Sequence, residues 1–182
     1  MSPPTPASRT YDRLYLDTTV LTNLATADVV DVVTETVENP RTSYAVRAEL
    51  ASGVDTGYDS LGRALDCLAE PLDGPDAEGI AVAGSLVRQR KPELLDRLAS
   101  SEASVLYQAW AAGVPLAVDD EDVWAVARSY QVPVTGSLAL VARAVELDVL
   151  TVEAADDALD RWRAADIAVP VDGVTQLLAG EE

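Results

Sequence analysis

The sequence predicts an α/β domain with a central parallel sheet and helices on both faces. Short apolar runs alternate with helical patterns in the second half of the chain, and strands joined through helices form the crossover connections of a parallel sheet. The length of 182 residues and the apolar content of 48 % suit one compact core. We expect a flexible tail over residues 1–11 and a single domain over 12–182, with helices between 151 and 180 packed on it.

Each strand is predicted from a short apolar or β-branched run, and each helix from apolar residues at helical spacing. In the first half, the predicted strands are 13–17 and 42–46, and the predicted helices are 18–25, 27–38, 47–52, 58–70 and 77–89. In the second half, the predicted strands are 114–118 and 132–134, and the predicted helices are 102–112, 123–130, 138–147, 152–165 and 174–178. Asn39-Pro40, Gly53 and Gly113 mark helix ends.

The charge balance is strongly acidic, with 13 basic residues against 31 acidic ones and a net charge of −18. Such a surface is typical of a halophilic protein, because in molar salt the Debye length falls to about 3 Å and self-repulsion costs little. The absence of histidine excludes His-ligated zinc sites and His-dependent catalytic triads. The chemistry available to this chain is therefore carboxylate chemistry.

The remaining bulk features indicate a cytoplasmic protein. The first ten residues lack the apolar region of a signal peptide, and no apolar run approaches the roughly 20 residues that a bilayer span requires. Cys67 is the single cysteine, so it forms no internal disulfide, and its helical apolar context predicts a small core side chain. A reducing cytosol and no membrane association are expected.

Five carboxylates stand out by position, since acidity alone says little in so acidic a chain. Asp17 and Asp119 directly follow predicted strands, Asp120 comes next, and Glu49 and Glu102 lie near predicted helix starts. The ligand crevice of an open parallel sheet lies beyond the carboxyl ends of its strands. Helix capping is the competing explanation for each acid alone. Clustered carboxylates repel one another and favour a bound cation, and all-oxygen ligands suit Mg²⁺ or Mn²⁺.

The order of these acids resembles the PIN-domain family of metal-dependent ribonucleases, which includes the VapC-type toxins. Four segments carry the resemblance: 14–24 (LYLDTTVLTNL), 46–50 (VRAEL), 101–110 (SEASVLYQAW) and 118–137 (VDDEDVWAVARSYQVPVTGS). The last segment is similar to an uncharacterised PIN subfamily, the helices that follow it also suit that subfamily, and the whole resemblance covers about residues 13–178. The resemblance implies metal ligands and catalytic residues at Asp17, Glu49, Glu102, Asp119 and Asp120, with Asp119 favoured over Asp120.

The resemblance also implies an activity and partners. The expected function is Mg²⁺- or Mn²⁺-dependent cleavage of RNA phosphodiesters by two-metal chemistry, as a toxin paired with an antitoxin or as an RNA-processing enzyme. A homodimer from a haloarchaeon-like organism is expected. Thr18, Thr135 and Ser137 are candidate donors that orient the carboxylates. Two departures are Ser101, where the subfamily has Gly, and Trp124, where it has Arg.

Two other functions remain open on the residues alone. A PIN-like module that binds RNA or protein without catalysis accommodates Trp124, and Trp162 between Arg161 and Arg163 is a candidate RNA contact. A phosphotransferase of haloacid-dehalogenase or receiver type also places an Asp after its first strand. Those mechanisms use a lysine at a strand end, whereas Lys91, the single lysine, lies in a polar stretch. We rank the phosphotransferase below the nuclease.

Overall fold

The computed structural model describes residues 11–71 and 85–179 and contains a four-stranded sheet. The strands are β1 (Tyr11–Leu16), β2 (Val37–Arg41), β3 (Leu116–Ala117) and β4 (Val134–Thr135). Their order in the sheet is β2-β1-β3-β4, and every neighbouring pair is parallel. The predicted α/β class with a central parallel sheet is thus confirmed.

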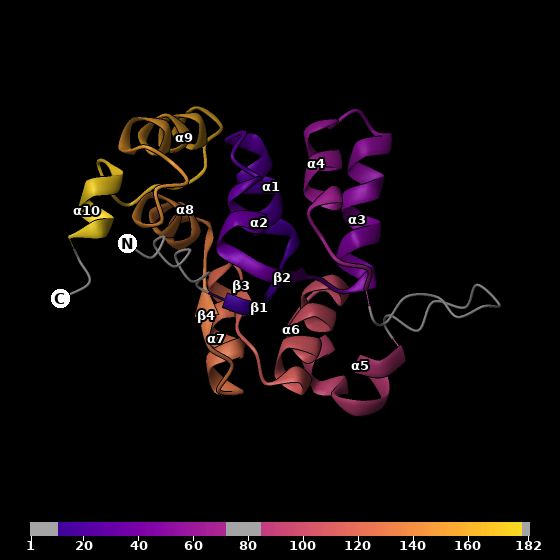
Figure 1. Cartoon of the computed structure of the whole chain (residues 1–182). Helices are drawn as coiled ribbons and strands as arrows, with labels where there is room; N and C mark the ends of the chain where they lie inside the picture. The colour runs from indigo at the N-terminus through magenta and orange to yellow at the C-terminus, as the bar shows by residue number, and fades with distance from the viewer. Residues whose placement is uncertain (1–10, 72–84, 180–182) are drawn as a thin grey trace, which may run out of the picture.

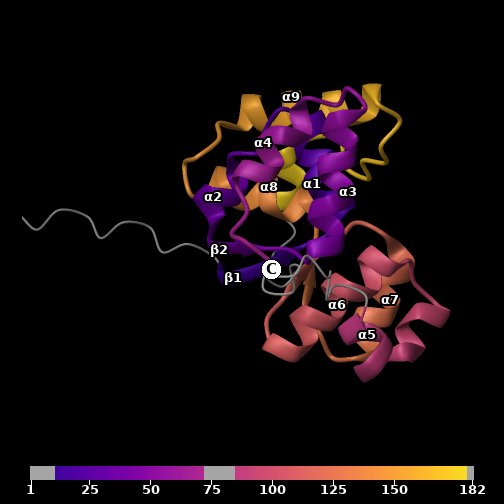
Figure 2. The same ribbon diagram turned by 90° about the vertical axis from the view of Figure 1, so that its right-hand side faces the viewer.

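Helices cover both faces of this sheet (Figures 1 and 2). They are α1 (Thr18–Thr26), α2 (Val32–Thr36), α3 (Tyr44–Asp55), α4 (Ser60–Asp66), α5 (Ser85–Arg90), the 3-10 helix η1 (Pro92–Asp96), α6 (Ser100–Ala112), α7 (Glu121–Ser129), α8 (Ser137–Glu146), α9 (Val152–Ala164) and α10 (Val174–Leu178). Helices α1, α2, α8 and α9 lie on one side of the strands, and α6 and α7 lie on the other. Helix α10 contacts α8 and α9.

The centre of the sheet is apolar on both faces, which explains the run of consecutive apolar residues in β1. Leu14, Tyr15 and Leu16 are all buried although they alternate between the two faces, as expected for a parallel strand covered on both sides. Tyr15 aligns with Leu116 of β3, and Leu16 aligns with Ala117. The ends of β1 and β3 therefore lie side by side, and so do the residues that follow them.

The second strand lies earlier in the chain than predicted. Residues 37–41 (VENPR) form β2, whereas the predicted strand 42–46 contains the start of α3, where Ser43 is the N-cap and accepts a 3.3 Å hydrogen bond from the Val46 amide. The prediction was wrong because Asn39-Pro40 was taken as a helix end. The order of the sheet makes β2 an edge strand, and an edge tolerates Pro40, which has no N–H to donate.

Other boundaries shift by a few residues. Strands β3 and β4 are shorter or displaced relative to 114–118 and 132–134, and the predicted helix 27–38 ends at Thr36. The predicted tail was 1–11, but Tyr11 is already the first residue of β1. Residues 1–10 and the first part of the predicted helix 77–89 lie outside the described residues. Among the residues that are described, no helix is long and apolar enough to cross a membrane.

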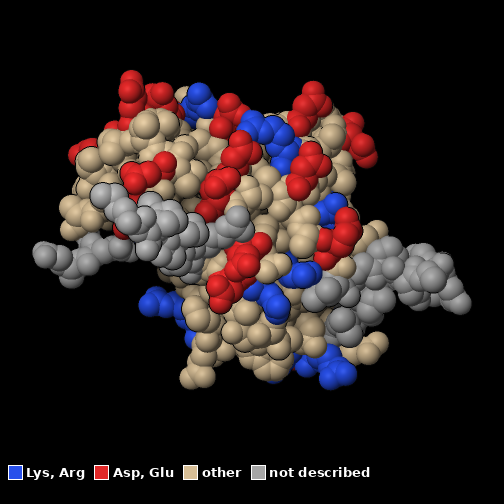
Figure 3. Space-filling model, in the orientation of Figure 1, with Lys and Arg blue, Asp and Glu red and all other residues tan. Residues whose placement is uncertain are grey.

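Acidic side chains are spread over much of the face seen in Figure 3. Several basic side chains lie against acids: Arg63 pairs with Asp28 and Asp31, and Arg143 pairs with Glu146 at 2.6 Å. Exposed pairs of this kind contribute little to stability. Each of these arginines offsets the charge of a neighbouring acid, and the net charge of −18 remains after all of them are counted.

Candidate active site

Asp17 is the most constrained carboxylate at the carboxyl ends of the strands. It follows β1 directly and is the N-cap of α1, with only 1 % of its surface exposed. Its Oδ2 accepts hydrogen bonds from the Thr19 hydroxyl at 2.9 Å and the Thr19 amide at 3.4 Å. Its Oδ1 is buried and has no hydrogen-bond partner within the described part of the chain. An ionised carboxylate with one buried, unpaired oxygen is costly, so this atom favours a proton or a cation.

The pKa of Asp17 is raised from its ordinary value. Burial is the largest cause, because it penalises the charged form. Hydrogen bonds from Thr19 and Thr18 lower the pKa in part, and repulsion from Glu49 raises it further. The site therefore contains a strand-end carboxylate that the protein alone does not fully stabilise as an anion.

Glu49 and Glu102 approach Asp17 from two different helices. Glu49 lies in the second turn of α3, which begins at Tyr44, so it is not at a helix start as predicted. Its Oε2 accepts a 2.8 Å hydrogen bond from the Thr18 hydroxyl. Glu102 is in the first turn of α6, and its Oε2 accepts the Ala99 amide at 2.8 Å.

Glu102 is electrostatically coupled to the other acids. Its pKa is raised, first by burial and then by repulsion from Asp17, Asp120 and Glu49, although the hydrogen bond from the Ala99 amide acts in the opposite direction. Three of the predicted acids, Asp17, Asp120 and Glu49, are thus close enough to Glu102 to raise its pKa. This mutual repulsion is the electrostatic condition under which a cation is favoured.

The two neighbouring aspartates after β3 have different partners. Asp119 Oδ2 accepts the Asn23 side-chain amide at 2.7 Å and the Ser137 hydroxyl at 2.6 Å, and Oδ1 accepts the Ser137 backbone amide at 2.9 Å. Asp120 is the N-cap of α7, and its Oδ1 accepts backbone amides from the first turn of that helix. Asp119 therefore ties β3 to α1 and α8, whereas Asp120 contributes to the repulsion on Glu102.

Asn23 and Gly136 belong to this arrangement and were missed in the sequence. A Cβ added to Gly136 would lie 2.7 Å from Asp119 Oδ1, so only glycine leaves room for the carboxylate. The Thr-Gly-Ser turn was a usable signal for Gly136, because Ser137 donates twice to the same carboxylate. Asn23 had no signal, since it lies within a helical pattern 96 residues away from its partner.

The hydroxyl residues have separate roles in the geometry. Thr18 donates to Glu49, and Ser137 donates to Asp119. Thr135 is buried in β4, where its backbone carbonyl accepts the Val118 amide at 2.9 Å.

These carboxylates do not form a ready-made metal cluster. Within residues 11–71 and 85–179, no group of three or more His, Cys, Asp or Glu side chains is arranged to hold a metal ion. Each of the five acids accepts at least one hydrogen bond from a backbone amide, a hydroxyl or a side-chain amide. The all-oxygen donor set and the unpaired Oδ1 of Asp17 nevertheless fit a hard divalent cation.

Two tryptophans have structural partners. The Trp124 indole N–H donates to the Val118 carbonyl at 2.5 Å. Trp162 is 1 % exposed, and its indole N–H donates to the Asn23 carbonyl at 2.6 Å. The proposed RNA contact at Trp162 was wrong, because the ring is part of the core that positions α1. Its neighbour Arg161 donates to the Ala27 carbonyl at 2.7 Å.

Lys91 is also held by neighbours away from the strand ends. Its Nζ lies 4.6 Å from the ring centroid of Trp110 and 5.3 Å from that of Tyr130, and it pairs with Glu93 at 3.5 Å. Trp110 is near the end of α6, whereas Glu102 is near its start. Lys91 is therefore not placed as a strand-end catalytic lysine.

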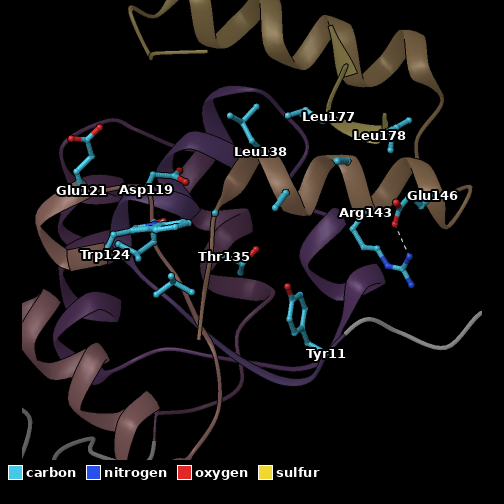
Figure 4. Close-up of a pocket in the computed structure, with 15 residues that line it drawn as sticks. Tyr11, Asp119, Glu121, Trp124, Thr135, Leu138, Arg143, Glu146, Leu177 and Leu178 are labelled. Atoms are coloured by element: carbon cyan, nitrogen blue, oxygen red, sulfur yellow. Dashed lines mark hydrogen bonds and ion pairs between the residues drawn. The ribbon is translucent and has the colours of Figure 1, made fainter. Parts of the chain in front are cut away.

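A cavity of about 540 Å³ lies beside the carboxylates, along the edge strand β4 (Figure 4). Asp119 and Trp124 lie together at one end, and Arg143 and Glu146 lie together farther along α8. The residues that line it are Tyr11, Val118, Asp119, Glu121, Trp124, Val134, Thr135, Gly136, Leu138, Ala139, Ala142, Arg143, Glu146, Leu177 and Leu178. The volume is in the range of small-molecule sites.

A parallel sheet with acids at its strand ends defines a class of α/β domains, and comparison with known proteins identifies the family. Residues 14–180 match the model of the family DUF3368, described as a PIN domain, so the chain belongs to this PIN-domain family. PIN domains are generally nucleases and typically use divalent metals. The family assignment confirms the PIN resemblance.

Comparisons with solved structures and with curated proteins do not refine this family assignment. The crystal structure of PAE2754 from Pyrobaculum aerophilum is similar with a TM-score of 0.49 and 17 % sequence identity, over 77 % of this chain and 99 % of that one. No curated protein matches the sequence.

Proposed function

We propose that this protein is a divalent-metal-dependent endoribonuclease whose active site is the group Asp17, Glu49, Glu102 and Asp120. One observation carries the proposal: the buried Oδ1 of Asp17 has no hydrogen-bond partner among the described residues, at the point where Glu49 and Glu102 add negative charge. Helix capping uses Oδ2 of Asp17 and does not explain why Oδ1 is buried without a hydrogen-bond partner.

The residues divide into ligands and positioning groups. Asp17, Glu102 and Asp120 would hold the ion, and Glu49 would complete the oxygen set. When bound, the metal supplies Lewis-acid stabilisation and activates water for attack on a phosphodiester. Thr19 fixes Asp17, and Thr18 fixes Glu49.

Asp119 is a positioning residue in this proposal, although the family resemblance favoured it as a ligand. Both of its oxygens already accept strong hydrogen bonds from Asn23 and Ser137. Asp120 uses only Oδ1 for the capping bonds. Of the two neighbours, Asp120 therefore has an oxygen with room for a cation.

A non-catalytic, RNA-binding PIN module is the second candidate. The observation that favours it is the lack of a preformed group of three metal-holding side chains in the described residues. Glu102 would have to leave the Ala99 amide, or share that contact, to bind an ion. The two functions differ in whether the metal-loaded protein cuts RNA.

The test combines metal binding with RNA cleavage in molar KCl. Mn²⁺ binding to the wild type, to Asp17→Asn and to Asp12→Asn is measured by calorimetry, with the exposed Asp12 as matched control. We expect the wild type and Asp12→Asn to bind Mn²⁺ and cleave single-stranded RNA, and Asp17→Asn to do neither. A wild type that binds RNA without metal-dependent cleavage contradicts the enzyme and supports the binding module.

The pair Asp119→Asn and Asp120→Asn tests the division of roles. Loss of Mn²⁺ affinity in Asp120→Asn, with affinity retained in Asp119→Asn, is expected. The reverse result would return the ligand role to Asp119.

The proposal includes a cellular setting. A cytoplasmic, halophilic toxin that forms a homodimer and is controlled by an antitoxin fits the PIN family and the net charge of −18. Light scattering in molar KCl tests the dimer, and rescue of growth by a neighbouring gene product tests the antitoxin. An RNA-processing enzyme would need no such rescue.

A further inference from the structure

We propose that the cavity beside Asp119 binds one unstacked base of the RNA substrate, and that it prefers a base with an exocyclic amino group. The inference rests on the proposed nuclease function and names the substrate class: single-stranded RNA with a base turned out of its stack. The observations that carry it are the position, the lining and the charge of the cavity.

The cavity adjoins the candidate active site through residues that position the carboxylates, and its lining does not include the four proposed ligands. Asp119 and Gly136 line the cavity and lie at the carboxyl ends of β3 and β4. Asp120, the next residue, contributes to the repulsion at Glu102. A base held in the cavity therefore places its attached phosphate beside the carboxylate group.

The walls suit a flat ring. Trp124 forms part of one wall from α7, and its N–H bond to the Val118 carbonyl keeps the indole in place without a ligand. Ala139 and Ala142 of α8 also line the cavity, and their small side chains leave it open. Aromatic walls of this kind bind unpaired bases in single-stranded nucleic acids.

The charges disfavour a phosphate inside the cavity and favour a neutral donor. Among the described residues that line it, three carry carboxylates, Asp119, Glu121 and Glu146, and one carries a guanidinium, Arg143, which is paired with Glu146 at 2.6 Å. The oxygens of Asp119 already accept hydrogen bonds from Asn23 and Ser137, so the acceptors proposed for the base are Glu121 and Glu146. Carboxylates accept hydrogen bonds and donate none. A base with an exocyclic amino group, such as cytosine or adenine, presents that NH₂ donor to a carboxylate, whereas uracil has a carbonyl acceptor in its place and only its ring N3–H to donate.

The size agrees with this occupant. The volume of about 540 Å³ exceeds the need of a base alone and accommodates a nucleoside. Leu138, Leu177 and Leu178 contribute apolar surface that excludes water from the ring. Exclusion of water strengthens the hydrogen bonds that distinguish one base from another.

The experiment compares two nucleosides of nearly equal size. Cytidine and uridine are titrated in molar KCl into metal-free Asp17→Asn protein and followed by NMR, so binding is measured without metal or cleavage. We expect cytidine to bind on the order of tenfold more tightly, because its amino group donates to a carboxylate at the position where uridine presents a carbonyl oxygen. Equal affinities, or no binding of either nucleoside, would overturn the proposal.

Two variants locate the site. Ala142→Trp fills the cavity and should reduce cytidine affinity at least about tenfold, whereas Ala164→Trp, on the exposed end of α9, should not. Ala142→Leu provides a smaller filling residue if the tryptophan prevents folding. Unchanged cytidine affinity in a folded Ala142 variant contradicts the assignment of this cavity.

The same variants separate the base site from the nuclease. If the base site exists in an active enzyme, Ala142→Trp retains Mn²⁺ binding but loses preference for the base next to the cleaved bond. Cytidine binding with no RNA cleavage by the wild type contradicts the nuclease and leaves the base site standing. Cleavage of RNA without nucleoside binding contradicts the base site alone. The same outcome is expected if the cavity binds a peptide and not a base.

Discussion

The side-chain amide of Asn23 donates a 2.7 Å hydrogen bond to Asp119, although the two residues are 96 positions apart. Asn23 lies on α1, which starts directly after Asp17. The contact therefore joins α1, the helix that follows Asp17, to Asp119, the carboxylate that follows β3. The Asn23 carbonyl in turn accepts the indole N–H of the buried Trp162, so α9 supports the same contact.

Removing the Asn23 amide should destabilise the protein. Asn23→Ala leaves one hydrogen bond fewer on a partly buried, charged acceptor, and a loss of about 1–3 kcal/mol in the free energy of unfolding is expected. Urea denaturation in molar KCl measures it. The exposed Asn39→Ala on β2 is the matched control and should change stability by less than about 0.5 kcal/mol. Equal effects of the two substitutions would argue against a structural role for the Asn23 contact.

Replacing Gly136 should displace Asp119. The new Cβ of Gly136→Ala would lie 2.7 Å from Oδ1 and 3.4 Å from the Val118 carbonyl, and the resulting shift should cost about 1–3 kcal/mol. Gly62→Ala is the control, because nothing lies within 4 Å of its added Cβ. In α4 that change should be neutral or stabilising by up to about 1 kcal/mol. The melting temperatures of both variants are measured by thermal unfolding. If both melting temperatures fall, the close approach at Gly136 is contradicted.

Neutralising Asp17 should stabilise the metal-free protein. Because the pKa of Asp17 is raised in the folded state above its ordinary 3.8, the folded protein holds this proton to higher pH than the unfolded chain. The contribution of Asp17 to stability therefore falls as pH rises from about 4 through the raised pKa. Asp17→Asn should remove that fall.

Denaturation of wild type and Asp17→Asn across pH 3–8, in the presence of a metal chelator, measures the difference. The difference in free energy between the two proteins should favour Asp17→Asn increasingly with pH. Added Mn²⁺ should raise the melting temperature of the wild type and leave that of Asp17→Asn unchanged. A wild type that gains stability relative to the variant as pH rises, without metal, contradicts the raised pKa.

Salt should stabilise the fold. The net charge is −18, and the Debye length falls from about 8 Å at physiological ionic strength to about 3 Å at 1 M. We expect the melting temperature to rise by more than about 5 °C between 0.15 and 2 M KCl, corresponding to roughly 2 kcal/mol. Calorimetry at matched pH measures it, with sucrose as an uncharged co-solute control. A melting temperature that falls with KCl would show that ion pairs such as Arg63–Asp28 outweigh the general repulsion.

Local patterns in the sequence determined much of the fold. The consecutive apolar residues of β1 and the helical spacing after Asp17 specify a buried strand followed by a helix, and Asp17 at the junction is the N-cap observed. The alternation in the second half likewise predicted β3, α7 and α8 near their observed positions. These features depend on neighbours within a few residues, so they can be read without the fold.

The second strand shows where local patterns fail. Residues 37–41 include Pro40 and look like a helix end, yet they form the edge of the sheet beside β1. An edge strand pairs with one neighbour only, so it needs fewer backbone N–H donors and tolerates a proline. Residues 42–46 look like a strand, yet Ser43 begins a helix there. In both places the sheet, through its register with β1, decided between two locally acceptable structures.

The sequence by itself determined which acids lie at the ends of strands, and it placed Asp17, Asp119 and Asp120 correctly there. Only the tertiary structure decided what each carboxylate meets. Asn23 and Ser137 bind Asp119, Asp120 adds to the charge around Glu102, and Asp17 keeps an unpaired oxygen. The physical reason is that a hydrogen bond or a repulsion depends on distances between segments that are far apart in the chain, and packing sets those distances.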